Sequence, residues 1–281
     1  MRIILFFILF AYSSATLINN DMIAKLSNSN LNHFSFVVMG DNRDGNNILN
    51  KIILKTNQDS SIKFLINNGD FLPNGYQKEY KSYLQIIKNS EKPILSVIGN
   101  HEIPWYDGKT NYKKIFGNTD FSFTCGNSYF IVLDSSDKKI SKKQFIWLEK
   151  ELEISQQYLN RFVVSHVPLY DPREGKYQRG HSFKKLKQAK KLNNLFDKYN
   201  VTMFFGSHIH LYFKGMWHNT PYIITGGAGA PLKKNGFYHY IKVIVNGANI
   251  EYKVVKIDAK PLSLIEQGVQ SIKDIFNLGD K

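Results

Sequence analysis

The sequence predicts an α/β fold, and three observations lead to this prediction. Apolar runs of strand length alternate with segments of helical spacing along most of the 281 residues. Asp41, Asp70 and Asn100 each follow such a run, at intervals of 29 and 30 residues, and this interval fits one β-α-β unit. Hydrophobic residues make up 43% of the chain, which is enough for a folded soluble protein with a sizeable core.

The first half of the chain alternates strands with helices. In order, the pattern predicts a strand over 34–40, a helix over 46–58, a strand over 62–66, a helix over 76–89 and a strand over 93–98. The strands are short continuous apolar runs, as strands buried on both faces are. The helices carry apolar residues at helical spacing, Ile48 with Ile52 and Tyr80 with Leu84.

The second half adds hairpins at both ends of a further α/β series. In order, we expect a hairpin over 120–134, a helix over 142–153, strands over 161–165, 201–205 and 222–225, and an antiparallel hairpin over 237–256. Period-two alternation before Gly126-Asn127 and an apolar run after it predict the first hairpin. Ser141 is a typical N-cap for the helix. The last hairpin alternates from Tyr238 onward.

The chain divides into four predicted segments. These are a signal peptide over 1–15, a lead-in over 16–33, one domain over 34–258 and a C-terminal amphipathic helix over 259–281. One domain is expected because residues suited to a single site extend from Asp41 to His210. The lead-in is polar and Asn-rich, so we expect it to be loose. The C-terminal helix carries both charge signs on its polar face, which favours packing on the domain over a membrane surface.

Residues 1–15 have the layout of a secretory signal peptide. Arg2 precedes an apolar run that continues to Tyr12, and small residues then lead to Ala15. A buried first strand or helix is the alternative. The apolar run is too short to span a bilayer comfortably. We therefore expect a secreted or periplasmic protein with no stable membrane span after cleavage.

Charge and cysteine content limit the classes of partner and chemistry. The net charge is +14, from 37 basic and 23 acidic residues, and such an excess suits a polyanionic partner. The basic residues are mainly lysines, scattered without a nucleic-acid-binding motif, so nucleic acid stays an open but disfavoured partner. Cys125 is the one cysteine, which excludes an intramolecular disulfide and a cysteine-based metal or redox centre.

Five apolar runs end in residues that commonly bind metal ions. They read FVVMGD, FLINNGD, ILSVIGNHE, FVVSH and FFGSHIH, and they deliver Asp41, Asp70, Asn100 with His101, His166, and His208 with His210. In open α/β sheets the carboxyl ends of the strands form the edge where ligands bind. Each residue alone is more often a turn residue, a cap or a buried polar group. Together they predict a metal site, because a soluble core rarely gathers so many ionisable groups without a countercharge.

This series resembles the calcineurin-like metallophosphoesterase family over roughly residues 35 to 256. Gly-Asn-His-Glu at 99–102 and Gly-Ser-His-Ile-His at 206–210 are its most specific parts. The resemblance implies two mixed β-sheets packed as a sandwich with helices on the outer faces, in four layers α/β/β/α. It also implies a phosphoric ester hydrolase with a dinuclear metal centre.

The resemblance implies a ligand set for two ions. Asp70 would bridge them, since one carboxylate can join cations held ~3.5–4 Å apart. The other ligands would be Asp41 and His210 for the first ion, and Asn100, His166 and His208 for the second. Oxygen donors mixed with imidazole suit divalent or trivalent Fe, Mn or Zn.

The first motif departs from the family pattern. The family has Asp-x-His, whose histidine binds the first metal, and this chain reads Asp41-Asn42-Arg43. Arginine is always protonated and cannot bind a cation. We therefore expect a weaker first site, with water, Asn42 or Asp44 as a replacement ligand. Arg43 is a candidate for catalysis and for gripping the substrate phosphate, with a surface arginine on a turn as the equal alternative.

We expect an exported phosphohydrolase, first of all a phosphomonoesterase that uses a metal-bound hydroxide. His101 lies beside a ligand but outside the ligand set, so we expect it to be the general acid, oriented by Glu102. Asn100, His101, Arg43 and Arg173 are the expected substrate contacts. The first alternative is a phosphodiesterase or a nucleotide or nucleic-acid hydrolase. The second is a non-catalytic protein that binds phosphate ligands.

Overall fold

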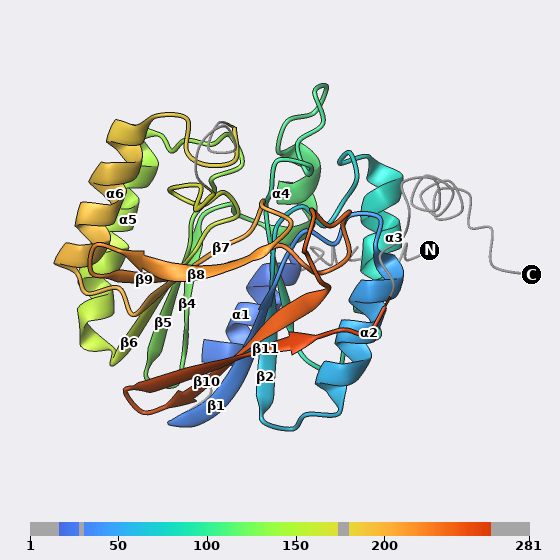
Figure 1. Ribbon diagram of the computed structural model, residues 1–281, viewed down its shortest axis with the longest axis horizontal. Coiled ribbons are helices and arrows are strands. Elements are labelled where there is room, and N and C mark those ends of the chain that lie inside the picture. Colours follow the sequence, from blue (N-terminus) through green and yellow to red (C-terminus); the bar gives the residue numbers. More distant parts are fainter. Residues whose placement is uncertain (1–16, 28–30, 174–179, 260–281) are drawn as a thin grey trace, which may run out of the picture.

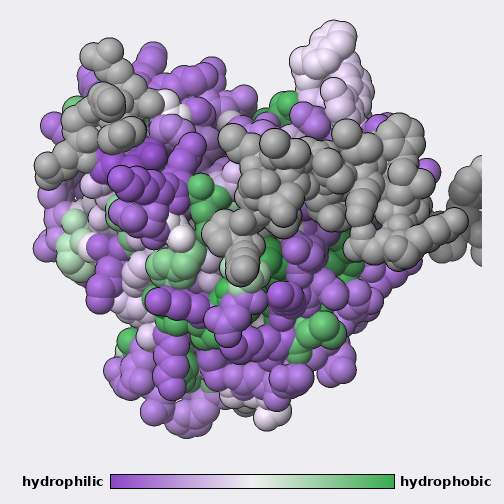
Figure 2. All heavy atoms as spheres, turned by 45° about the vertical axis from the view of Figure 1, so that its right-hand side comes forward, coloured by the Kyte–Doolittle hydropathy of each residue, from purple (hydrophilic) through white to green (hydrophobic). Residues whose placement is uncertain are grey.

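The computed structural model describes residues 17–27, 31–173 and 180–259. The predicted signal peptide and residues 260–281 of the predicted C-terminal helix lie outside the described residues, and both stay predictions. Within the described part of the chain, no helix combines the length and apolar character needed to cross a membrane. The face seen in Figure 2 is mostly hydrophilic, with apolar residues in small separate patches.

The first sheet has five strands in the order β11-β10-β1-β2-β3. Their bounds are β1 (His33–Met39), β2 (Ile62–Asn68), β3 (Ile94–Val97), β10 (His239–Asn246) and β11 (Asn249–Lys256). Strands β1, β2 and β3 are parallel, while β10 runs antiparallel to β1 and to β11. Helices α2 (Asn46–Asn57) and α3 (Gln77–Ile87) connect the parallel strands, and α4 (Thr110–Phe116) follows β3.

The second sheet has six strands in the order β4-β5-β6-β7-β9-β8. Their bounds are β4 (Phe121–Cys125), β5 (Ser128–Val132), β6 (Asn160–Val164), β7 (Met203–Gly206), β8 (Tyr212–Trp217) and β9 (Thr220–Thr225). Strands β5, β6, β7 and β9 are parallel, and β4 and β8 are antiparallel strands at the edges. Helices α5 (Lys142–Ile154) and α6 (Leu186–Lys198) supply two crossovers, and Ser141 caps α5 as predicted.

The two sheets pack face to face, with helices outside both (Figure 1). Helices α2 and α3 cover the first sheet, on the right of the view, and α5 and α6 cover the second, on the left. The predicted four-layer α/β/β/α class is therefore confirmed. The predicted strands and hairpins are present, with ends that differ by a few residues.

Strand β1 shows why these sequences read as continuous apolar runs. Phe36 and Val38 point into the core between the sheets, while Val37 and Met39 pack on the helix side. The inner layer is largely aromatic. Phe36 is 5.1 Å, centroid to centroid, from Phe130 of β5, to which it is edge-on, so this pair links the two sheets. Such pairs add about 0.5–1.5 kcal/mol beyond the area they bury.

The expected loose lead-in is wrong for residues 18–27, which form helix α1 (Ile18–Ser27). Leu26 is buried in the core between the sheets. The side chain of Asn19 pairs with the backbone of Ser96 in β3, donating to its carbonyl at 2.9 Å and accepting from its N–H at 3.1 Å. The helix thus closes the open edge of β3, and a polar segment becomes ordered through this pairing.

We expect Asn19→Ala to lower the free energy of unfolding by about 2 kcal/mol. The change removes two buried hydrogen bonds worth about 1 kcal/mol each and leaves the N–H of Ser96 without this acceptor, while the Ser96 carbonyl keeps the hydroxyl of Tyr112 as a donor. Urea denaturation followed by circular dichroism measures this loss. Asn20→Ala is the matched control, because Asn20 is exposed on the same helix. Equal losses for the two variants would contradict the anchoring role of Asn19.

Candidate metal centre

The carboxyl ends of parallel strands from both sheets meet at one edge of the sandwich. β1 and β2 of the first sheet lead to Asp41 and Asp70, and β6 and β7 of the second lead to His166 and His208. Asp41, Asp70 and His208 have positive φ angles of 58°, 53° and 66°. Such backbone costs about 1–3 kcal/mol per residue and clusters at functional sites. The backbone is therefore shaped to bring these side chains together.

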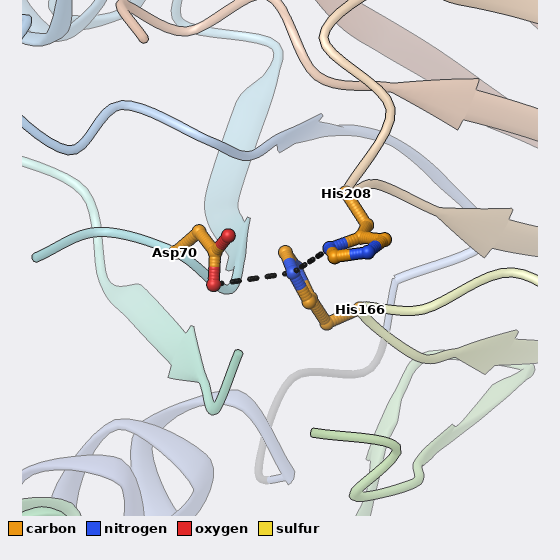
Figure 3. Close-up of side chains that lie close together, drawn as sticks. All are labelled: Asp70, His166 and His208. Carbon is orange, nitrogen blue, oxygen red and sulfur yellow. Dashed lines mark hydrogen bonds and ion pairs between the residues drawn. The ribbon is translucent and has the colours of Figure 1, made fainter. Parts of the chain in front are cut away.

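Asp70, His166 and His208 form a compact cluster that suits a metal ion (Figure 3). Oδ1 of Asp70 is 3.2 Å from Nε2 of His166, which is 3.2 Å from Nδ1 of His208. One ligand atom from each residue lies within 4.8 Å of the other two. Donors bound to one ion at about 2.0–2.2 Å are separated by similar distances. Oδ1 of Asn100 is buried without a hydrogen-bond partner among the described residues, as a metal ligand would be.

Backbone carbonyls fix how two of the imidazoles face the site. Nδ1 of His166 donates to the carbonyl of Asn68 at 2.8 Å, and Nδ1 of His210 donates to that of Pro231 at 2.7 Å. Each contact leaves Nε2 directed at a carboxylate, in the manner of metal-bound histidines. Gly69 allows the first arrangement, because its φ is 85° and a Cβ there would lie 2.6 Å from Nδ1 of His166.

The pKa shifts within the cluster show that Asp70 is held as a carboxylate beside a positive charge. Burial opposes ionisation of Asp70, but the adjacent His166 outweighs it and lowers the pKa of Asp70. Burial would lower the pKa of His166, yet the Asp70 carboxylate raises it to about 9. Burial and the charge of His166 lower the pKa of His208 to about 3. The protein therefore places one positive charge beside the carboxylate, and a metal ion would supply more.

The expected ligands of the first ion are also close to each other. Oδ1 of Asp41 is 3.3 Å from Nε2 of His210 and has no hydrogen-bond partner among the described residues. Oδ2 of Asp41 accepts from the hydroxyl of Ser207 at 2.5 Å and from the backbone N–H of His208 at 2.8 Å. Oδ2 of Asp41 therefore holds the loop after β7, and only Oδ1 faces His210.

Asn42 does not replace the missing histidine of the first motif. Its Oδ1 accepts from Nδ2 of Asn67 at 2.8 Å, and its own Nδ2 donates to the carbonyl of Phe71 at 3.3 Å. Both polar ends of Asn42 are thus used inside the first sheet. Arg43 lies in a turn and is half-buried, and its Nη2 is 3.4 Å from Nε2 of His210.

His101 lies beside the cluster and is open to solvent. Its side chain is 27% exposed, and Nε2 is 3.9 Å from Oδ2 of Asp70. Nδ1 contacts the carbonyl of Pro73 at 2.5 Å and donates to it, which leaves Nε2 as the nitrogen that faces the site. The backbone N–H of His101 donates to Oδ1 of Asp70 at 2.9 Å. The position suits a proton donor to a leaving group.

Glu102 does not orient His101, contrary to expectation. Its carboxylate accepts from the backbone N–H groups of Asp70 at 2.8 Å, Leu72 at 2.9 Å and Gly99 at 2.7 Å. Burial and the Asp70 charge raise the pKa of Glu102 to about 8, and the amides of Leu72 and Gly99 oppose this rise. Glu102 thus joins the loops after β2 and β3. The local sequence could not show these partners, because two of the three lie 30 or more residues away.

Positive groups gather on one side of the centre. Arg173 makes a two-pronged contact with Asp171, with Nε to Oδ1 at 2.9 Å and Nη2 to Oδ2 at 2.7 Å. Burial and the charges of Arg173 and Lys138 lower the pKa of His181, whose ring centroid is 5.6 Å from that of His208. Sequence reasoning missed Lys138 because nothing in its local pattern places it near the site. The substrate contact of Arg173 stays a prediction.

Aromatic side chains surround a hollow next to His101. Asn100 and His101 line this hollow together with Tyr76 and Trp105. Trp105 is 92% exposed, and Tyr76 stacks on Tyr106 with ring centroids 6.1 Å apart. These rings therefore lie on the side of the site where His101 would meet a leaving group. Tyr106 packs on the rim against Tyr76, while Trp105 is open to a ligand.

Comparisons with known proteins identify the family of the chain. A family model described as calcineurin-like phosphoesterase matches residues 34–212. The human serine/threonine-protein phosphatase CPPED1 is 25% identical over 199 residues, which cover 66% of this chain and 61% of that protein. An Fe(3+)-Zn(2+) purple acid phosphatase 12 of Arabidopsis thaliana is 24% identical over 241 residues, covering 76% and 49% respectively. The chain thus spans less than two thirds of either curated relative.

A solved structure shows the same fold. It is the purple acid phosphatase PPD1 from yellow lupin seeds, with a TM-score of 0.65 and 16% sequence identity. The match covers 80% of this chain and 53% of that chain. At this identity the likeness concerns the fold alone.

Proposed function

Because the chain belongs to the calcineurin-like phosphoesterase family, we propose that it is a metal-dependent phosphomonoesterase. The observation that carries this proposal is the cluster of Asp70, His166 and His208 at metal-binding distances, with the unpartnered Oδ1 of Asn100 beside it. When bound, a metal ion supplies a Lewis acid that activates water and neutralises charge on the phosphoryl group.

The chain's own residues then position the substrate and move the proton. Because Nδ1 of His101 donates to the carbonyl of Pro73, the proton that it would transfer is the one that Nε2 carries when the imidazole is protonated. From there it would protonate the leaving oxygen, a role worth typically 10²–10⁴-fold in rate. Asn100 would contact the phosphoryl group through its amide, and Arg43 would grip it through its planar fork.

The donor set supports Fe, Mn or Zn as the metal. Carboxylate and amide oxygens combined with imidazole nitrogen suit these ions and disfavour Cu(I). The name of the Arabidopsis relative includes Fe(3+) and Zn(2+), which points the same way. The expected two-ion centre has a full ligand set for the second ion. For the first ion it has Asp41, His210 and the shared Asp70.

Monoesters are favoured over diesters by two facts. The curated relatives reported above are both named phosphatases. Positive groups near the centre, among them Arg43 and Lys138, suit the second negative charge that a monoester carries. A diesterase or nucleotide hydrolase would use the same ligands, so it is the alternative that an experiment must separate.

A substrate panel tests the proposal. The purified chain is assayed on matched nitrophenyl mono- and diesters after loading with Mn, Zn or Fe. We expect turnover of the monoester to exceed that of the diester by at least about tenfold, and chelation to abolish it. Faster diester turnover would establish the diesterase alternative. Absence of turnover with every metal would favour the non-catalytic binding protein.

Export of the protein stays a prediction. It rests on the signal-like pattern of residues 1–15, from Arg2 to Ala15. We propose a secreted or periplasmic location on this basis alone.

A further inference from the structure

We propose that the centre holds one metal ion per chain, and that the guanidinium of Arg43 takes the place of the first ion of the family's pair. The inference rests on the proposed function, since the ion at the second site is the one that the proposed hydrolysis uses. It concerns the number of ions bound, so it can fail while the function stands.

His210 offers a single lone pair toward the first site. Its Nδ1 donates to the carbonyl of Pro231 at 2.7 Å, so the neutral imidazole carries its lone pair on Nε2. Nη2 of Arg43 lies 3.4 Å from this Nε2, and a guanidinium can only donate to it. A metal ion would need the same lone pair at about 2.0–2.1 Å. Arg43 and a first-site ion therefore compete for one nitrogen.

The rest of the first site is too poor in donors to win this competition. Of the Asp41 carboxylate, Oδ2 is taken by Ser207 and by the backbone of His208, which leaves Oδ1. The amide of Asn42 is bonded within the sheet. An ion would keep Oδ1 of Asp41, a share of Asp70 and a contested His210. The second site keeps Asn100, His166 and His208 for itself and has its own share of Asp70.

Arg43 is held at the centre by its own backbone. Its N–H donates to the carbonyl of Asp70 at 3.0 Å, and its φ of 35° lies in the left-handed region. With its backbone held at Asp70, Arg43 places Nη2 3.4 Å from Nε2 of His210. Nε of Arg43 is buried without a hydrogen-bond partner among the described residues, so the guanidinium is held close to the centre with one donor unused. A fixed positive charge with spare donors can neutralise a phosphoryl oxygen without a metal.

Metal counting on the whole chain tests the inference. Wild type, Arg43→His and Arg43→Lys are loaded with excess Mn, dialysed, and analysed for metal per chain. We expect one ion for wild type and two for Arg43→His, because histidine both removes the competing donor and supplies the family's ligand. Arg43→Lys is the matched control, which keeps the charge and should hold one ion. Paramagnetic resonance of the bound Mn separates single ions from coupled pairs without any assay of activity.

The outcomes are distinct. Two tightly held ions in wild type overturn the inference, whatever the variants do. One ion in folded Arg43→His overturns it as well, and circular dichroism verifies the fold. A wild type with one ion and no turnover on any ester leaves the inference standing and removes the proposed function. A wild type that hydrolyses monoesters and holds two ions supports the proposed function and overturns the inference.

Discussion

Replacing Asp70 with asparagine is expected to abolish tight metal binding and to lower kcat/KM for a phosphate monoester by more than about 100-fold. Loss of a group that only supports a metal ligand typically costs 10–100-fold, and Asp70 is placed to bind the ion directly. It is also 99% buried at the centre of the cluster, beside His166 and His101. The isosteric amide keeps the volume but removes the charge that attracts the cation.

Metal analysis after dialysis and steady-state kinetics measure these two effects. Asp21→Asn is the control, because Asp21 lies on α1 in an exposed pair with Lys25 and should leave both quantities unchanged. The Asp70→Asn chain should stay folded by circular dichroism, since the loss is one of charge and not of volume. A variant that kept its metal and most of its activity would show that the ion sits elsewhere.

The elements that could be predicted are those whose local sequence shows by its apolar pattern that they are buried. Strands such as β1 are covered on both faces, so they appear as unbroken apolar runs that end in Gly40 and Asp41. Parallel strands place their carboxyl ends at one edge, which turns a series of strand-end ligands into a single site. Asp41, Asp70, His166, His208 and the others were found in this way, from type and position alone.

Some elements were not predicted because distant contacts order them. In one further helix the local pattern was present but was overlooked. Helix α1 is polar, and Asn19 orders it through β3, which is 77 residues further along the chain. Helices α4 and α6 and edge strand β8 were also missed. In α6 the signal was present, since Ala189, Leu192 and Phe196 lie at helical spacing and are buried. Half-exposed β8 has no such stripe.

Within the site, residue types were predictable and partners were not. His101 and Glu102 are adjacent, and adjacency suggested that one orients the other. In the folded chain they diverge, His101 to the carbonyl of Pro73 and Glu102 to backbone amides of the loops after β2 and β3. Arg43 likewise could be recognised as a departure from the pattern, but its contact with His210 spans 167 residues. Such pairings depend on how the two sheets meet.

His101→Asn is expected to slow hydrolysis of alkyl phosphates by about 10²–10⁴-fold and that of nitrophenyl phosphate far less. A general acid matters in proportion to the basicity of the leaving oxygen, and a nitrophenolate leaves without a proton. In the protonated imidazole of His101, Nε2 is the nitrogen that faces the site with a proton, because the N–H of Nδ1 is hydrogen-bonded to the carbonyl of Pro73. The readout is the ratio of the two substrates' kcat/KM values, measured for wild type and variant under identical metal loading.

This ratio separates proton donation from a purely structural role. If His101 only held Asp70 in place, its loss would slow both substrates by the same factor and would reduce bound metal. Its backbone N–H, which bonds Oδ1 of Asp70, remains in the variant, so the carboxylate should keep that support. His218→Asn is the control, since His218 is exposed in the turn before β9, at the edge opposite the centre. Equal slowing of both esters would therefore remove His101 from the chemistry and leave it as a support of the metal site.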